Sequence, residues 1–264
     1  MIALRGFSQQ GRIAYSEGDF LTLSGENFFY RCWRVPGPSE LVILVHDLGE
    51  DSGHYREVGE RIASEGISVY IMDLRGHGKS CGERGHVDNF QRMVRDLSLF
   101  VNLAASKEKS QPYILAQGFG ALLALGYAAT GRVRGLVLYS PLVTLKDAED
   151  YVTGVKAALM DLFASKKRVQ LNLGSRVTVT VRLLRELARV QGSLHDYAKR
   201  VEAPTLIIYD PNSEVVDSDA VLRLFESLGS REKYIREVSG GYSLLKSSDE
   251  ALEEALAWIK DREG

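Results

Sequence analysis

The chain has 264 residues, of which 45% are hydrophobic and 26% are charged, enough apolar material for one large α/β domain or two small ones. A formal net charge of −2 gives no electrostatic reason to expect nucleic acid as the main partner. Two cysteines, Cys32 and Cys81, are too few for a disulfide framework, and no apolar run approaches the roughly 18 residues of a membrane helix.

The beginning of the chain has no basic segment followed by an apolar core, so no signal peptide is expected. The sequence therefore predicts a cytoplasmic protein. Asn and Gln are sparse whereas Glu, Lys, Arg and Val are frequent, a balance that favours a thermophilic source.

The predicted elements begin with a β-hairpin and continue as alternating strands and helices. The segment GDFLTLSGENFFYRCWRV (18–35) alternates apolar and polar residues around SGEN, which is typical of a hairpin. Continuous apolar runs then predict strands that are covered on both faces, separated by helical stretches. The strands are expected at 40–46, 67–74, 113–117 and 135–141, and the helices at about 52–65, 88–105 and from residue 120. This alternation requires crossover connections and predicts a parallel sheet.

After Pro141 the alternation stops, and residues 142–201 are interpreted as a helical insertion. Within it, Val155, Leu159 and Phe163 stand at helical spacing and predict an amphipathic helix that packs on the core or docks on a membrane or partner. Alternation resumes with strand 203–210, a helix at about 217–228, the strand KYIREV and a C-terminal helix. The sequence thus predicts a core of residues 1–141 and 202–264 with a cap of residues 142–201.

The stretch YILAQGFGALLALGYAAT (113–130) reads as a buried strand, a sharp turn rich in glycine and an apolar helix. In one large class of enzymes this arrangement carries a serine nucleophile in the pattern G-x-S-x-G. The five residues here are Ala116, Gln117, Gly118, Phe119 and Gly120, so glycine stands at the serine position.

The chain resembles the α/β-hydrolase family and, within it, the monoacylglycerol lipase and lysophospholipase branch. The resemblance rests on residues 44–90, above all the segments DLRGHGKS and RGHV, and on VRGLVLYSP and APTLIIYD on either side of the insertion. It implies the α/β-hydrolase fold: a mostly parallel central sheet with an N-terminal antiparallel hairpin, helices on both faces, and a helical cap that acts as a lid.

The resemblance also implies a serine nucleophile, an acid, a histidine and backbone N–H groups that hold the oxyanion. These positions fall on Gly118 for the nucleophile, Ser213 for the acid and Ser243 for the histidine. A small shift in the alignment would let Asp210, Glu214 or Asp217 supply the carboxylate. No shift supplies the base, because no histidine follows His195 in the sequence.

The oxyanion loop departs from the pattern as well. The branch has H-G-x-G after the third strand, and this chain has His46, Asp47, Leu48 and Gly49. A carboxylate at Asp47 is expected to repel the negative charge that develops on a substrate carbonyl. Hydrolysis by a Ser-His-Asp triad is therefore predicted to be absent.

Two functional hypotheses follow. The first is a pseudoenzyme that keeps a binding role, either for a lipid-like or apolar ligand in the old acyl pocket or for a protein partner. The alternative is a hydrolase or other enzyme that acts on lipid-like esters through non-canonical residues. Burial would raise the pKa of Asp47 and make it a candidate acid or base. The candidate pocket residues are His46, Asp47, Leu48, Gln117, Gly118, Phe119 and Ser243.

No cofactor or metal is expected, because no pair of histidines has the spacing of metal ligands on one helix. His46, His77 and His86 are interpreted as structural residues that bond loop backbone or line the pocket. A reactive thiol at Cys81, paired with His77 or His86, is a further alternative.

Overall fold

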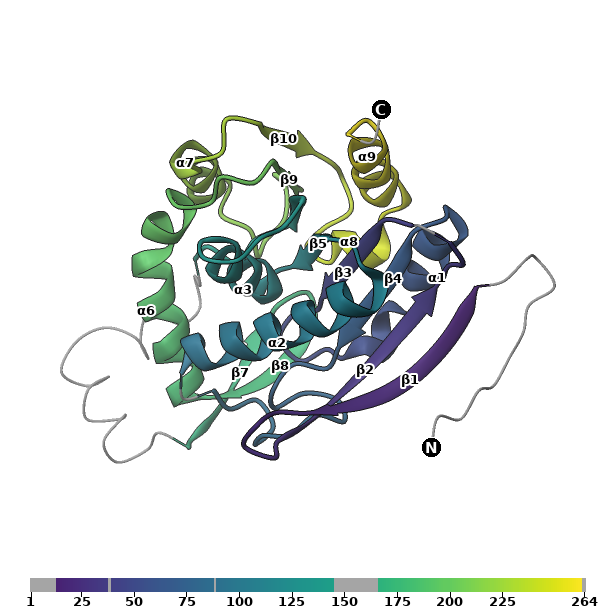
Figure 1. Cartoon of the computed structure of the whole chain (residues 1–264). Helices are drawn as coiled ribbons and strands as arrows, with labels where there is room; N and C mark the ends of the chain where they lie inside the picture. Colours follow the sequence, from purple (N-terminus) through teal and green to yellow (C-terminus); the bar gives the residue numbers. More distant parts are fainter. Residues whose placement is uncertain (1–12, 38, 88, 145–165, 263–264) are drawn as a thin grey trace.

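The computed structural model describes residues 13–37, 39–87, 89–144 and 166–262. Its centre is an eight-stranded sheet with the strand order β1-β2-β4-β3-β5-β6-β9-β10 (Figure 1). The first two strands form the expected antiparallel hairpin, β2 is antiparallel to β4, and every later pairing is parallel. The strands are β1 (Ala14–Leu21), β2 (Asn27–Arg34), β3 (Leu41–Val45), β4 (Ser68–Met72), β5 (Pro112–Gln117), β6 (Gly135–Tyr139), β9 (Thr205–Tyr209) and β10 (Lys233–Glu237).

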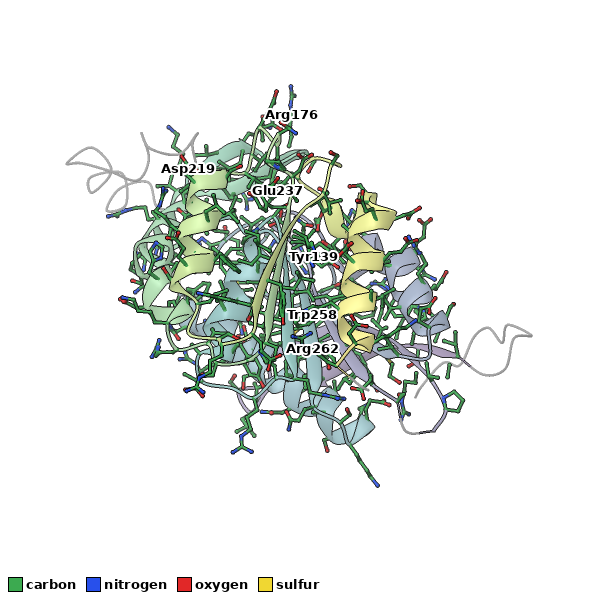
Figure 2. All side chains as sticks on the ribbon, turned by 90° about the horizontal axis from the view of Figure 1, so that it is seen from above. Tyr139, Arg176, Asp219, Glu237, Trp258 and Arg262 are labelled. Atoms are coloured by element: carbon green, nitrogen blue, oxygen red, sulfur yellow. The ribbon has the colours of Figure 1, made fainter. Side chains whose placement is uncertain are left out.

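Helices cover both faces of this sheet, which explains why its inner strands are buried along their whole length and mostly apolar. One face packs against α1 (Arg56–Ser64), α8 (Leu244–Ser247) and α9 (Asp249–Lys260), with the short 3₁₀ helix η1 (Ser52–Tyr55) leading into α1. The other face packs against α2 (Phe90–Glu108), α3 (Phe119–Ala128), α6 (Val181–Ala198) and α7 (Ser218–Ser227). Figure 2 shows α7 and α9 on opposite sides of the sheet.

The insertion differs in part from the sequence-based expectation. Residues 168–180, predicted to be helical, form an antiparallel hairpin of β7 (Arg168–Asn172) and β8 (Arg176–Thr180), and only then does α6 begin. Apolar residues alternate along this hairpin, so one side of it is buried and the other exposed. The predicted amphipathic helix with Val155, Leu159 and Phe163 lies outside the described residues. Among the helices of the described ranges, none has the length and apolar character needed to cross a bilayer.

The loop after β4, which carries the DLRGHGKS segment, is fixed by a buried arginine. The Arg75 guanidinium donates two hydrogen bonds to Asp96 on α2, at 2.7 and 3.0 Å, and two to Glu26 in the β1–β2 turn, at 2.5 and 3.1 Å. Planar, bidentate pairs of this kind are strong and geometrically specific. This part of the family resemblance therefore reflects a structural clamp that joins the N-terminal hairpin to the helical layer.

The glycine that closes the turn between β5 and α3 is required by packing. A Cβ on Gly120 would lie 2.6 Å from the backbone oxygens of Val45 and His46, in the neighbouring strand and the loop that follows it. A clash with backbone atoms cannot be relieved by the rotation of a side chain. The close contact between α3 and β3 therefore depends on the absence of a side chain at this position.

We expect Gly120→Ala to lower the free energy of unfolding by about 2–4 kcal/mol, as overpacking against backbone does. The matched control is Gly192→Ala in α6, where a Cβ would have no neighbour within 4 Å. That variant should be neutral or more stable by up to about 1 kcal/mol, because alanine is the better helix former. Urea unfolding of both variants measures the difference, and equal midpoints would contradict the packing argument.

Candidate functional site

The candidate site is built around the sharp turn at Gly118, between β5 and α3. Gly118 has φ 56° and ψ −113°, a conformation that residues with a Cβ rarely adopt. Its N–H donates to the Tyr139 carbonyl at 2.9 Å, and its carbonyl accepts from the Leu142 N–H at 3.2 Å. The turn is therefore held by the neighbouring strand β6 and by the segment that leaves that strand.

The carboxylate of Asp47 lies against this turn from the loop after β3. The Phe119 N–H, the first of helix α3, donates to Asp47 Oδ1 at 2.7 Å. A Cβ built on Gly118 would overlap both the Asp47 carboxylate and the Tyr242 hydroxyl. These two polar groups consequently fill the space into which a side chain on the turn would extend.

Asp47 is only 3% exposed, and its environment disfavours the negative charge. Burial raises the pKa of this carboxyl to about 7, and the nearby negative charge of Glu50 adds to the effect. Hydrogen bonding from the Phe119 N–H and interaction with the Tyr242 hydroxyl work in the opposite direction without cancelling it. The increase is the one expected from the sequence for a carboxylate in an apolar pocket.

Glu50 is the second carboxylate of the site. Its Oε2 accepts from the Asp47 N–H at 3.2 Å and from the Tyr55 hydroxyl at 2.5 Å, while Oε1 pairs with the Lys246 ammonium. Burial alone would raise the pKa of Glu50, but the hydrogen bonds from Lys246 and Tyr55 hold it below its ordinary value. Glu50 is therefore ionised, and it ties the loop after β3 to helix α8.

Gln117 ties the same helix to the turn. Its Nε2 donates to the Tyr242 carbonyl at 2.8 Å, and its Oε1 accepts from the Leu245 N–H at 3.2 Å. Both hydrogen bonds are buried. The side chain proposed as a pocket residue thus bridges the strand before the turn and the segment that carries Ser243.

Asp210, at the end of β9, accepts three hydrogen bonds from the backbone. Its Oδ2 accepts from Gly240 and Gly241 at 2.9 and 2.7 Å, and its Oδ1 accepts from Asn212 at 2.9 Å. The Gly241 N–H, and after it that of Gly240, lowers the pKa of this carboxyl. Asp210 therefore anchors the loop after β10, which leads to Tyr242.

The other residues considered for the acid and base positions have local partners. The Ser213 hydroxyl accepts from the Val215 N–H at 3.3 Å. Asp217 caps α7 by accepting from Ala220 at 3.0 Å, and Glu214 is exposed. Ser243 precedes α8, where its carbonyl accepts from the backbone of that helix.

The histidines of the loops after β3 and β4 bond to backbone or to the Thr180 hydroxyl at the end of β8. His46 is fully buried: its Nε2 accepts from the Leu74 N–H at 2.9 Å, and its Nδ1 lies 2.8 Å from the Asp47 carbonyl. Burial lowers the pKa of His46, so the ring is neutral and Nδ1 donates. His77 bonds the Arg75 carbonyl, and His86 bonds the Thr180 hydroxyl, both at 3.0 Å.

Cys81 does not have the surroundings of an activated thiol. Burial raises its pKa, whereas a reactive cysteine needs a lowered one. The imidazoles of His77 and His86 are engaged elsewhere, as described above.

The hairpin β7–β8 lies over the turn and its loops. A Cβ on Gly49 would contact the Val177 side chain at 2.8 Å, so β8 packs on the loop that carries Asp47. At the tip of the hairpin, a Cβ on Gly174 would lie 3.7 Å from Tyr242 and 3.8 Å from the Ser243 hydroxyl. Figure 2 shows Arg176 of this hairpin and Arg262, after α9, at opposite ends of the sheet. The hairpin therefore lies at the carboxyl ends of the parallel strands.

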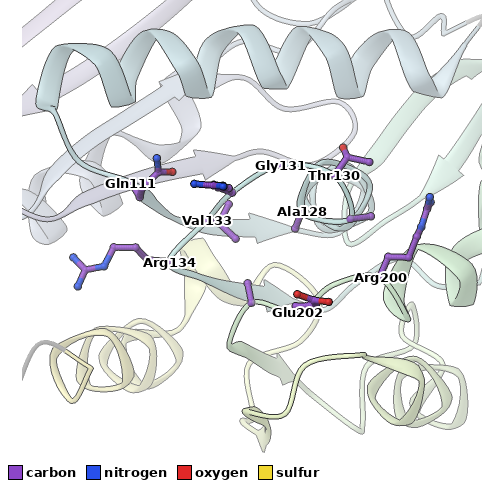
Figure 3. A pocket seen from close by; sticks show the side chains of 11 residues that line it. Gln111, Ala128, Thr130, Gly131, Val133, Arg134, Arg200 and Glu202 are labelled. Carbon is purple, nitrogen blue, oxygen red and sulfur yellow. The ribbon is translucent and has the colours of Figure 1, made fainter.

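A cleft of about 610 Å³ lies at the other edge of the sheet (Figure 3). It is lined by residues that precede β5, β6 and β9, among them Gln111, Arg134 and Glu202. Ligands of open α/β sheets bind at the carboxyl ends of the strands, so this cleft is separate from the candidate site. Across the described ranges, no group of three or more His, Cys, Asp or Glu side chains is arranged to hold a metal ion.

The structure adds three side chains to the predicted site: Glu50, Tyr242 and Lys246. Glu50 directly follows the HDLG segment and Tyr242 directly precedes the predicted base position, so both were within reach of the sequence pattern. Lys246 carries no signal of its own, because its role depends on a partner nearly two hundred residues away.

Comparison with known proteins agrees with this architecture. Residues 36–178, more than half of the chain, match the family model described as serine aminopeptidase, S33. The monoacylglycerol lipase of Mycolicibacterium smegmatis is 24% identical over 270 residues, which cover 92% of this chain and 96% of that protein. The monoglyceride lipase of Rattus norvegicus is 26% identical, with 90% and 88% of the two chains covered.

Solved structures show the same fold. A soluble variant of the monoglyceride lipase from Saccharomyces cerevisiae superposes with a TM-score of 0.76 at 18% identity, covering 99% of this chain and 97% of that one. The monoacylglycerol lipase of Paleococcus ferrophilus gives a TM-score of 0.72 at 22% identity, covering 88% and 97%. The predicted α/β-hydrolase fold and the resemblance to the monoacylglycerol lipase branch are confirmed, and the chain belongs to the serine aminopeptidase S33 family of α/β-hydrolases.

Proposed function

We propose that this protein is a catalytically degenerate member of the lipase- and esterase-like α/β-hydrolases that retains a binding role. One observation carries the proposal: the Asp47 carboxylate accepts the Phe119 N–H at 2.7 Å, at the turn where the nucleophile of an active relative is expected. The backbone donor that would stabilise a substrate oxyanion is thereby already occupied by an acceptor of this chain.

The chemistry explains why this arrangement is unsuited to acyl transfer. The reaction needs an attacking oxygen, a proton acceptor and donors for the oxyanion. Gly118 provides no oxygen, the position expected for the base is Ser243, and a carboxylate lies where negative charge would develop. In serine proteases the loss of the nucleophile or the base alone costs about 10⁶ in rate.

The nature of the ligand is suggested by the relatives. Relatives that match nine-tenths or more of the chain are named as lipases of monoacylglycerols, and this supports a lipid-like or apolar ligand for the present chain. A protein partner, a cytoplasmic location and a thermophilic source remain predictions from the sequence.

The direct test uses a serine-reactive fluorophosphonate probe and a monoacylglycerol substrate. We expect no covalent labelling and no ester turnover above background for the wild-type protein, because the turn at Gly118 carries no hydroxyl. The rat monoglyceride lipase, assayed in parallel, is the positive control. Stoichiometric labelling of the purified protein would overturn the proposal.

Gly118→Ser should fail to create an esterase and should destabilise the fold by about 1–3 kcal/mol, because the new side chain overlaps Asp47 and Tyr242. Adding Asp47→Gly should recover a large part of that stability, so that the two changes are strongly non-additive. Chemical denaturation of the two single variants and the double variant measures the coupling. Additive effects would mean that Asp47 does not occupy the space in front of the turn.

A variant with all four positions changed tests whether inactivity comes from the side chains at these positions or from the fold around them. Asp47→Gly, Gly118→Ser, Ser213→Asp and Ser243→His together restore every position that the family pattern requires. We expect this variant, unlike Gly118→Ser alone, to be labelled by the fluorophosphonate probe. Labelling of Gly118→Ser at the same rate would show that another base serves the site.

A second candidate function rests on the raised pKa of Asp47. A buried carboxyl with a pKa of about 7 is suited to general acid or base catalysis near neutral pH. An enzyme of this kind, acting on lipid-like esters, should lose its turnover in the Asp47→Asn variant. Screening esters, thioesters and lysophospholipids with both forms decides the matter, and turnover that depends on Asp47 favours this candidate over the first.

The same carboxyl predicts how stability depends on pH. Because its folded-state pKa is raised from 3.8 to about 7, the native state binds the proton more tightly than the unfolded chain does. The contribution to stability is complete below about pH 4 and is lost as the pH rises to 7, an effect of at most about 4 kcal/mol. Asp47→Asn should therefore raise the melting temperature more at pH 8 than at pH 5. A gain that is independent of pH would contradict a raised pKa.

A further inference from the structure

The hydrogen-bonding polarity at the turn is the reverse of that in a serine hydrolase. An oxyanion site presents backbone N–H donors to the oxygen of a substrate carbonyl. In this protein the Phe119 N–H is taken by Asp47 Oδ1, so what faces the site is a carboxylate. A carboxylate is an acceptor when it is ionised, with about four lone-pair positions on its two oxygens. The site has therefore exchanged a donor for an acceptor.

Two buried hydroxyls have unused hydrogen-bonding capacity, one beside this carboxylate and one at the end of β6. Among the described residues neither Tyr242 Oη nor Ser140 Oγ forms a hydrogen bond of good geometry, although the Tyr242 hydroxyl interacts with the Asp47 carboxylate. Tyr242 lies beside the Asp47 carboxylate at the turn, and Ser140 follows β6, the strand paired with β5. Tyr242 is 5% exposed and Ser140 is fully buried. Buried polar groups without partners are rare, and a bound molecule is one of the explanations they call for.

The charge at the site is also unbalanced. Asp47 and Glu50 are two neighbouring carboxylates, and Lys246 pairs with Glu50 alone. Buried apolar side chains, including Leu48, Phe119 and Val177, surround them. Charges attract more strongly in such surroundings than in water, so one positive charge placed beside Asp47 would be strongly favoured.

We propose that the Asp47 carboxylate at the Gly118 turn, beneath the β7–β8 hairpin, binds the head group of an amphiphile that donates hydrogen bonds, above all a primary alkylammonium. Esters and free carboxylates are disfavoured there, because both present acceptors to Asp47. This inference rests on the proposed binding function and names its ligand class.

The groups that face Asp47 come from several elements and define the pH dependence. They are Glu50 and His46 on either side of Asp47 in the chain, Tyr55 of η1, Tyr242 of the loop after β10 and, through Glu50, Lys246 of α8. Hydrogen bonds keep the pKa of Glu50 low, burial lowers that of His46, and burial raises those of both tyrosines. Asp47 is the member of this set that changes charge near neutrality. Ammonium binding should therefore strengthen from pH 6 to pH 8.

The experiment compares ligands that differ only in their head group. Dodecylammonium, dodecanol, methyl dodecanoate and dodecanoate, each below its micelle concentration, are titrated into the wild-type protein by calorimetry at pH 8. We expect the ammonium to bind about tenfold or more tightly than the ester or the carboxylate, as charge-assisted hydrogen bonds allow. Its affinity should fall severalfold at pH 6, whereas the affinity of the alcohol should not change.

Variants assign this preference to Asp47. Asp47→Asn keeps the shape and removes the charge, so the preference for the ammonium should disappear. Tyr242→Phe should weaken the ammonium and the alcohol together. Glu60→Gln removes an exposed carboxylate of α1 and should change nothing. If Asp47→Asn does not fold, the pH series on the wild-type protein decides the question instead.

The outcomes separate this inference from the proposed function. Turnover of the ester would overturn the proposed function, whatever the ammonium does. Absence of turnover, together with ester binding as tight as ammonium binding, would overturn this inference and leave the proposed function standing. An ammonium preference that persists in Asp47→Asn would also overturn it, because the attraction would then come from elsewhere.

Discussion

The hydrogen bond from the Phe119 N–H to the Asp47 carboxylate is the contact on which the candidate site depends. It joins the loop after β3 to the first residue of α3, across the turn at Gly118. The absence of a side chain at Gly118 makes room for this carboxylate, and the carboxylate in turn leaves no room for a side chain. Glycine at position 118 and aspartate at position 47 therefore depend on each other.

Polar side chains also join the other loops at this edge of the sheet. Gln117 binds the backbone around α8, Glu50 binds Lys246 of the same helix, and Asp210 binds the backbone after β10. Each net hydrogen bond of this kind contributes about 1 kcal/mol, and more where a charged group takes part. Active sites commonly hold strained or incompletely paired groups at a cost in stability. Here, most of the polar side chains at the corresponding edge serve to hold loops together.

Much of the fold was predictable from the sequence because its signals are local. Period-two alternation predicted the hairpin of β1 and β2, and apolar runs between helices predicted the parallel strands. The hairpin of β7 and β8 was missed although it carries a local signal of its own: Val169, Leu171, Val177 and Val179 alternate around a turn at Gly174, whose φ is +70°. The strong helical pattern that follows, in α6, outweighed it.

The site was less predictable, since its contacts join residues far apart in the chain. The direction of the pKa change of Asp47 follows from chemistry alone once burial is assumed. The positions of Tyr242 beside Asp47 and of Lys246 beside Glu50 do not follow from chemistry alone. They depend on how the loop after β10 and helix α8 pack against the turn. A motif identifies which loops meet, whereas only the folded chain shows which atoms meet.

The geometry of the turn itself explains why it persists with glycine at its apex. Gly118 adopts a conformation with positive φ. Contacts on both sides of Gly118 fix the backbone conformation of the turn. Gly120 lies against the backbone of Val45 and His46. The Gly118 N–H and carbonyl form hydrogen bonds with the backbone of Tyr139 and Leu142. Packing of α3 on the sheet thus requires the turn whether or not it carries a nucleophile. Glycine at the apex avoids strain at a turn that the fold has to keep, and a side chain there would add that strain together with a clash against Asp47.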